Sequence, residues 1–315
     1  MKNIFLCVFF ITACSLEKDE GNYAGSNQLP TVESINSTNK DQSISTSIGH
    51  LHADAPNNLA GEALAHSSIF KQSYSCDDEI LLKYNNLSNE ALTEICNKLS
   101  LVRQHFFELF TGAGSPVKDH EQKKLNVHLF SSFNEYQRNI KAESRLQFAE
   151  FPNGGFFYEG RLSSDNAHIY LFLTQLTKMV WNLEHEFAHF LVAKYVKAGE
   201  VIDTPPYLFW EEGLAEYLAE KLLAAPLFTL NKNSRLYSLN EIKSFSYNNI
   251  NNNVFYQWSK LAIEYLITEH YNLFYLLYMA LRDNKLNYFE KAIADFSASY
   301  ETEFNLWIKN KINNK

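Results

Sequence analysis

Apolar residues recur along this chain of 315 residues first with the period of strands and later with the period of helices. Short or alternating apolar runs predict strands at 79–83, 125–129, 156–159 and 167–173. Apolar positions three or four residues apart predict helices at 88–112, 133–142, 175–195, 210–224, 255–270, 273–282, 288–296 and 302–312. A mixed sheet early in the chain, followed mainly by helices, indicates an α+β fold.

The N-terminal segment has a different pattern. A basic start and a short apolar run over 4–13 predict a secretory signal at 1–13, because the run is too short to span a bilayer. The run ends in Cys14 and resembles a bacterial lipobox, so we expect acylation of Cys14 after cleavage; a plain signal with an incidental cysteine is the alternative. Ser15 is typical of outer-membrane sorting. The polar segment 14–75 predicts a flexible tether, with an ordered pro-segment as the alternative.

Composition and charge narrow the class of protein. Hydrophobic residues make up 46% of the chain and aromatic residues 15%, which fits a globular enzyme. A net charge of -8 argues against binding to nucleic acid, since no excess of basic residues is available to neutralise phosphates. Cys76 and Cys96 remain after Cys14 and the signal, and an even pair in an exported chain favours a disulfide; two free thiols are the alternative.

The strongest chemical signal is the H-E-x-x-H sequence from His185 to His189, inside a predicted helix. Residues four apart lie on one helix face, so both imidazoles can reach one zinc ion, and Glu186 can act as base to a zinc-activated water. A catalytic zinc needs a third protein ligand. Glu212 on the next helix supplies it, and Glu216 one turn later can accept a hydrogen bond from His185. A solvated helix face is the alternative for these two acids.

Several segments together resemble the bacterial collagenase family of gluzincin metallopeptidases. They are 153–160, 181–191, 210–217 and 255–258, with the region from Cys76 to Cys96. The resemblance covers about residue 76 to the C-terminus. It implies a zinc peptidase domain at 76–225 and a small all-helical helper subdomain at 226–315.

The resemblance also implies roles for single residues. His185, His189 and Glu212 correspond to the zinc ligands, and Glu186 corresponds to the general base and acid. Tyr247 lies at the position of the tyrosine that stabilises the oxyanion, although an ordinary loop tyrosine is the alternative.

Two further sites follow from the same resemblance. Gly154, Gly155, Phe156 and Tyr158 correspond to a double-glycine turn and an edge strand along which a substrate peptide can pair; a plain hairpin turn is the alternative. Family members also bind a structural calcium near the zinc helix. The corresponding ligands are the carboxylate of Glu159 and the carbonyls of Val196, Lys197 and Gly199.

We therefore expect a monomeric zinc endopeptidase that is exported and held at the membrane by a lipid on Cys14. The family's large activator domain and collagen-binding modules have no counterpart in the resemblance. Peptides and unfolded proteins, including collagen-derived ones, are consequently the expected substrates, rather than native collagen. The alternative is a surface lipoprotein that binds peptides or matrix without catalysis. An aminopeptidase is disfavoured because its G-x-M-E-N motif is not evident.

Overall fold

The computed structural model describes residues 68–118, 120–144, 146, 154–159, 165–174, 179–197, 204–222, 230, 234–247 and 249–313. These residues belong to one compact unit that spans 41–315. The predicted signal, Cys14 and most of the predicted tether lie outside the described residues, as does Gly199. No helix in the described ranges is both long enough and apolar enough to cross a membrane.

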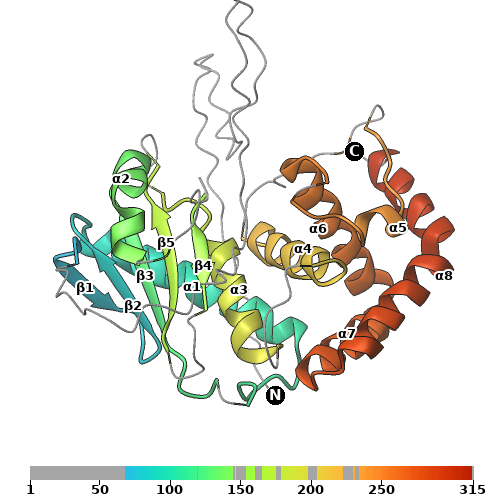
Figure 1. Cartoon of the computed structure of the whole chain (residues 1–315), viewed down its shortest axis with the longest axis horizontal. Coiled ribbons are helices and arrows are strands. Elements are labelled where there is room, and N and C mark those ends of the chain that lie inside the picture. The colour runs from blue at the N-terminus through green and yellow to red at the C-terminus, as the bar shows by residue number, and fades with distance from the viewer. Residues whose placement is uncertain are drawn as a thin grey trace, which may run out of the picture. The chain divides into compact units, whose positions relative to one another are not determined.

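A mixed sheet forms the first part of the described chain (Figure 1). Its strands are β1 (Gln72–Ser75), β2 (Ile80–Tyr84), β3 (Leu125–Phe130), β4 (Phe156–Tyr158) and β5 (Ala167–Phe172), in the spatial order β1-β2-β3-β5-β4. Strands β2, β3 and β5 are parallel, whereas β1 and β4 pair antiparallel at the two edges. The α+β class with a mixed sheet is confirmed.

Strand β1 lies within the segment predicted as a tether, so the ordered sheet begins earlier than the sequence pattern indicates. Its sequence is Gln-Ser-Tyr-Ser and its side chains are mostly exposed, because it is an edge strand that buries little apolar area. The disulfide between Cys76 and Cys96, predicted from the sequence, joins the end of this hairpin strand to the following helix, with a Cα–Cα distance of 5.3 Å. A loop closed in this way loses conformational entropy in the unfolded state, which stabilises the fold.

Alternating side chains of the sheet face two different layers. Helix α2 (Phe133–Ser144) covers the face that carries Phe130, Tyr170 and Phe172. The other face carries Val127, Leu129, Ile169 and Leu171, which join one apolar core with the buried residues of α1 (Asn89–Leu109) and α3 (Leu183–Tyr195). Because successive strand side chains point to opposite faces, α3 is held against one face of the sheet and contacts β4 and β5.

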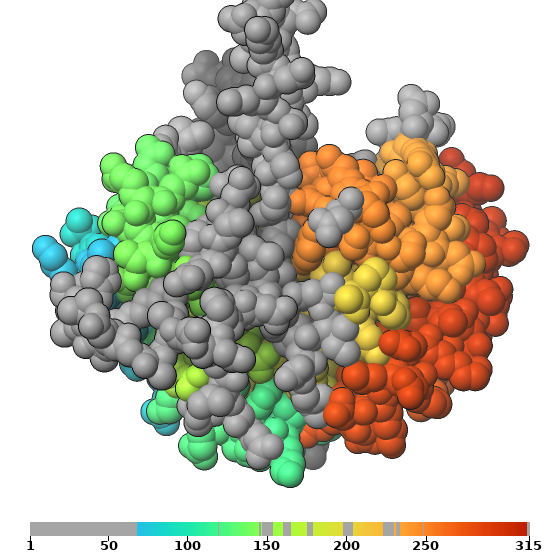
Figure 2. Space-filling model, in the orientation of Figure 1, coloured from blue at the N-terminus to red at the C-terminus, as the bar shows by residue number. Residues whose placement is uncertain are grey.

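The remaining helices are α4 (Tyr207–Glu220), α5 (Leu239–Ile242), α6 (Asn252–Glu269), α7 (Tyr271–Arg282) and α8 (Leu286–Asn313). Helices α5 to α8 form the surface coloured orange to red in Figure 2. Two helices predicted at 288–296 and 302–312 are a single helix, α8. The polar residues between them do not interrupt it, and the buried Ser297 hydroxyl donates to the carbonyl of Ile293 on the same helix (2.6 Å).

Helix α3 begins at Leu183, not at 175 as the apolar pattern predicts. The chain before it forms a short antiparallel bridge between Leu173 and Val180, and Asn182 then has a left-handed backbone with φ of 60°. Apolar spacing cannot distinguish this short bridge from a first helical turn, since a run of only a few apolar residues is too short to show either period.

A glycine allows α4 to lie close to α6. A Cβ atom added at Gly213 would lie 2.5 Å from the backbone oxygen of Ser259 and 2.8 Å from the side chain of Ile263. Any other residue would therefore push the two helices apart. Because Gly213 directly follows Glu212, this close contact sets the position of the carboxylate that the sequence predicts as a metal ligand.

Candidate metal centre

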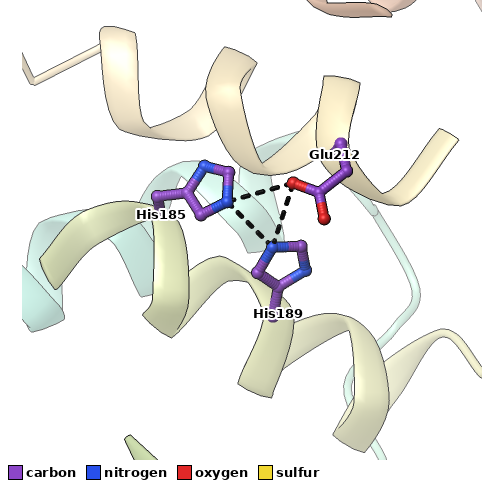
Figure 3. Close-up of side chains that lie close together, drawn as sticks. All are labelled: His185, His189 and Glu212. Carbon is purple, nitrogen blue, oxygen red and sulfur yellow. Dashed lines mark hydrogen bonds and ion pairs between the residues drawn. The ribbon is translucent and has the colours of Figure 1, made fainter. Parts of the chain in front are cut away.

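Three buried side chains converge between α3 and α4. His185 and His189 lie on one face of α3, and Glu212 lies on the facing side of α4 (Figure 3). Their exposed fractions are 3%, 3% and 1%. The two imidazole Nε2 atoms are 3.0 Å apart, and Glu212 Oε2 is 3.2 Å from Nε2 of His185 and 3.6 Å from Nε2 of His189. Within the described residues this is the group of three that can hold a metal ion.

The triangle of ligand atoms fits a tetrahedral zinc ion. Bonds of about 2.0–2.1 Å at tetrahedral angles put neighbouring ligand atoms about 3.3 Å apart. The three observed separations, from 3.0 to 3.6 Å, bracket that value. Two imidazole nitrogens and one carboxylate oxygen are also the donor set of a catalytic zinc that keeps one position open. The residues present therefore fit the ion that the sequence motif predicts.

Carboxylates around His185 hold it in one orientation. Glu216, one turn after Glu212 on α4, places Oε1 at 3.0 Å from Nδ1 of His185, the contact expected from the sequence. Burial by itself lowers the pKa of His185, but the two carboxylates outweigh burial and raise it well above its usual value. Burial likewise raises the pKa of Glu212, but His189 and His185 hold it well below its usual range. Glu212 is thus an anionic ligand at neutral pH.

Glu186 is buried beside this cluster, with 3% of its surface exposed. Burial is the main cause that raises its pKa, and the nearby Glu212 raises it further, against the two histidines. Asn182, the residue before α3, donates from Nδ2 to Oε1 of Glu186 (2.8 Å). A carboxylate with a raised pKa and one oxygen held in place is suited to accept a proton and return it.

Two tyrosines from the second half of the chain reach the cluster. The hydroxyl of Tyr247 donates to Oε1 of Glu212 in a short hydrogen bond. Tyr256 on α6 places its ring 5.8 Å from the ring of His185. Burial, followed by the charges of the neighbouring glutamates, raises the pKa of Tyr256 well above its usual value. Tyr256 belongs to the segment 255–258 that carried the family resemblance, but no pattern in the sequence distinguishes it from the other tyrosines as a residue of the site.

The predicted substrate strand lies at the edge of the sheet beside α3. Gly155 has φ of 91°, and a Cβ atom there would lie 2.6 Å from the backbone oxygen of Tyr170 on β5. The close approach of β4 to β5 therefore already requires this glycine. Phe156 is buried and stacks on Tyr170 (5.0 Å between ring centroids), while Tyr158 is half-buried. The side chain of Phe156 therefore packs in the apolar core beside the sheet, whereas the backbone of β4 forms the edge strand of the sheet.

The contacts of Glu159 do not fit the predicted calcium site. Its Oε1 is 3.5 Å from Nζ of Lys123 and 3.4 Å from Nε2 of His120, and its carbonyl accepts a hydrogen bond from Lys123 Nζ (2.9 Å). A calcium ion needs six to eight oxygen ligands, and here a lysine ammonium faces the one predicted carboxylate. The side chain of Lys197, a residue predicted to offer its carbonyl, reaches Glu211 on α4 (3.4 Å).

Comparison with known proteins identifies the family. Residues 53–307 match the family model of peptidase M9, collagenase. A microbial collagenase of Vibrio alginolyticus is 28% identical over 255 residues, which cover 78% of this chain and 31% of that protein. Microbial collagenases of Vibrio parahaemolyticus and Vibrio vulnificus are 23% and 22% identical, and each match covers 76% of this chain and 30% of the relative.

The chain thus spans about a third of the length of the curated relatives it matches. The matched region contains the whole described sheet, α3 and α4, and therefore all three residues of the metal cluster. The family match covers most of the chain and agrees with the buried His-His-Glu cluster. This protein belongs to the collagenase family of metallopeptidases, peptidase M9.

Proposed function

We propose that this protein is a zinc-dependent endopeptidase whose catalytic centre is the cluster of His185, His189 and Glu212. The observation that carries the proposal is the convergence of these three ligand atoms next to the buried Glu186. When bound, zinc polarises the scissile carbonyl and lowers the pKa of water, which is the chemistry that peptide hydrolysis needs.

The remaining residues orient groups and move protons. Glu186 takes a proton from the attacking water and returns it to the leaving amine, and its raised pKa makes it a stronger base for the first step. Asn182 keeps one oxygen of Glu186 occupied, so the other is directed to the proton. Glu216 accepts the Nδ1 proton of His185, which leaves the Nε2 lone pair free for the metal and makes the imidazole more basic.

Tyr247 is proposed as the donor to the oxyanion that develops on the scissile carbonyl. The hydroxyl lies at the cluster, where it donates to Glu212, so it is close enough to exchange this partner for substrate. Until substrate arrives, the same bond holds the carboxylate of Glu212 in its orientation.

The proposed substrates are peptides and unfolded proteins. Membership of the family supports peptide-bond hydrolysis, but the match covers about a third of each curated relative, so the collagen of their names is not carried over to this chain. The substrate backbone is proposed to run along β4, because this strand is at the edge of the sheet and contacts α3.

We further propose that the protein is exported and held to a membrane by a lipid on Cys14. The disulfide between Cys76 and Cys96 supports export, since such bonds persist outside the reducing cytosol. Metabolic labelling with a radioactive fatty acid tests the anchor. The wild-type chain should incorporate label and fractionate with membranes, and Cys14→Ser should do neither.

The decisive test of catalysis compares two glutamates on the same helix. Glu186→Gln should retain zinc but lower kcat on a peptide library by about 10²–10⁴-fold, the usual contribution of a general base. Glu184→Gln is the control, because Glu184 lies two residues away and faces Lys98 at 3.8 Å instead of the cluster. Stoichiometric zinc in a wild-type chain that cuts no library peptide would refute the peptidase and favour a peptide-binding lipoprotein.

A further inference from the structure

A cluster of charged groups, buried or partly buried, lies at the C-terminal end of α3. We call it the lysine clamp, and it consists of Glu79, His120, Lys123, Glu159 and Lys194. Its members come from four places in the chain: the residue before β2, the connection between α1 and β3, the residue after β4, and α3 itself. The lysines are the most deeply buried members, with 1% of each side chain exposed.

Lys123 ties the end of β4 to the connection between α1 and β3. Its Nζ donates to the carbonyl of Glu159 (2.9 Å) and lies 3.5 Å from Glu159 Oε1. His120 approaches the same oxygen with Nε2 (3.4 Å), while its Nδ1 donates to the carbonyl of Ala193 in the last turns of α3 (2.8 Å). One carboxylate therefore meets an ammonium and an imidazole that together connect it to α3.

Lys194 completes the clamp from the helix. Its Nζ donates to Glu79 Oε1 (2.7 Å) and to the carbonyl of Lys123 (2.9 Å). The backbone N–H of Val117 in turn donates to the carbonyl of Lys194 (2.9 Å). These bonds bring positive charge and donors to the end of a helix, where unpaired carbonyls carry partial negative charge and cations are stabilising.

The clamp includes Glu159, the carboxylate of the calcium site that the family resemblance predicts, and it contacts the end of α3 that leads to the other predicted ligands. We propose that, in this chain, the ammonium groups of Lys123 and Lys194 stabilise this end of α3 in place of a calcium ion. Two ammonium groups carry the same charge as one calcium ion, and Lys123 already faces Glu159, the carboxylate that is predicted to bind calcium. A calcium ion close to Glu159 would face the buried ammonium of Lys123 at short range, and this repulsion is unfavourable.

The first experiment adds calcium instead of removing it, because chelators of calcium also strip zinc. Full-length protein prepared without calcium and loaded with one equivalent of zinc is melted with and without calcium at about 5 mM. The melting temperature should change by less than about 1 °C, and elemental analysis after dialysis against calcium should find zinc alone. A rise of several degrees that Glu159→Gln abolishes would overturn the proposal.

The second experiment removes the internal cation. Lys123→Met should lower the melting temperature by about 5 °C or more, because it leaves the Glu159 carboxylate buried without its cation. The double variant Lys123→Met/Glu159→Gln should recover much of that loss, since it removes both charges. Lys124→Met is the matched control, because Lys124 is the next residue and its side chain is exposed.

Equal melting temperatures for Lys123→Met and the control would overturn the proposal. If Lys123→Met does not fold, Lys123→Arg takes its place and should stay within a few degrees of wild type, since it keeps the charge. The calcium titration of the wild-type chain decides the question in either case.

Discussion

The two ends of helix α3 deal with buried charge in opposite ways. Towards its N-terminus, His185 and His189 point their Nε2 atoms at the carboxylate of Glu212, with Glu186 and Glu216 close by. At its C-terminus, the lysine clamp sets Lys123 and Lys194 against Glu159 and Glu79. The first group is rich in acceptors and needs an added cation, whereas the second already contains its cations.

This contrast shows that a carboxylate near a helix is a poor indicator of a metal unless its partners are known. Glu212 and Glu159 are both predicted metal ligands, and both are largely buried. They differ in what faces them: two imidazole nitrogens face Glu212, whereas a lysine ammonium and one imidazole nitrogen face Glu159. Donor chemistry, more than burial or charge alone, separates a site that fits a metal from one that does not.

The largest expected effect, on zinc binding and catalysis, comes from exchanging one carboxylate for an amide at each end of helix α3. Glu212→Gln should weaken zinc binding by more than about 100-fold and abolish peptide hydrolysis, because it removes the anionic ligand. Glu159→Gln should leave the zinc content unchanged and lower the melting temperature instead. Zinc titration and thermal unfolding of both variants measure this difference. Equal loss of zinc in both would show that the two ends are not independent.

A smaller effect should follow at the tyrosine that touches Glu212. Tyr247→Phe should lower kcat by about 10²-fold if its hydroxyl stabilises the oxyanion, with zinc affinity nearly unchanged. If zinc affinity also falls, by about 10-fold, the hydroxyl of Tyr247 acts mainly by orienting Glu212. Tyr237→Phe is the control, since the ring of Tyr237 packs against Phe245 and Trp258. Peptide assays with parallel zinc titrations separate the two roles.

Packing between α4 and α6 should affect only the zinc end of α3. Gly213→Ala should destabilise the protein by about 1–3 kcal/mol, because the new Cβ meets the backbone of Ser259. Denaturant unfolding measures this loss. Zinc affinity should fall as well, since a shift of α4 moves Glu212. The loss of melting temperature caused by Lys123→Met should be the same in the Gly213→Ala background as in the wild-type background. Undiminished zinc affinity in Gly213→Ala would contradict this view of the glycine.

The smallest effect is expected on the far face of the sheet, away from both ends of α3. Glu143 on α2 accepts hydrogen bonds from the Ser68 hydroxyl and the Ile69 N–H. Burial raises its pKa, but contacts with His128, Ser68 and Ile69 prevail and lower the pKa to about 2. A lowered pKa means that the carboxylate stabilises the folded state above its unfolded pKa and loses this effect as the pH falls towards 2.

Glu143→Gln should therefore lower the unfolding free energy at pH 7 by about 1 kcal/mol, the usual contribution of such bonds. The difference from wild type should shrink as the pH falls from 4.5 towards 2, the interval over which wild-type Glu143 is protonated. Denaturant unfolding at several pH values measures it. A difference that grows in acid would contradict the assignment, and zinc content should not change at neutral pH.

Much of the zinc site was predictable because it depends on local periodicity. The spacing of His185 and His189 places them on one face of any helix, and Glu212 next to Gly213 marks the second helix. The disulfide and the mixed sheet followed in the same way from composition and pattern. Strand β1 escaped prediction because it is short and exposed, and the start of α3 because the preceding bridge buries apolar residues too.

Contacts between distant segments were not predictable. Lys123 has the sequence context of a surface lysine beside Lys124, and nothing in the pattern shows that only one of the two is buried. Tyr256 similarly occurs among many aromatic residues of the chain, and its contact with His185 depends on the packing of α6 against α4.

The sequence alone determined the family, the helix face that carries two histidines, and the carboxylate that completes the set. These features depend on residue types and their spacing along one or two helices. Helix geometry alone then places the side chains on one face. The tertiary structure decided which carboxylate meets two imidazole nitrogens and which meets a lysine ammonium. That choice depends on side chains far apart in the sequence, brought together by burial of the common core, and only the folded chain places them within hydrogen-bond distance.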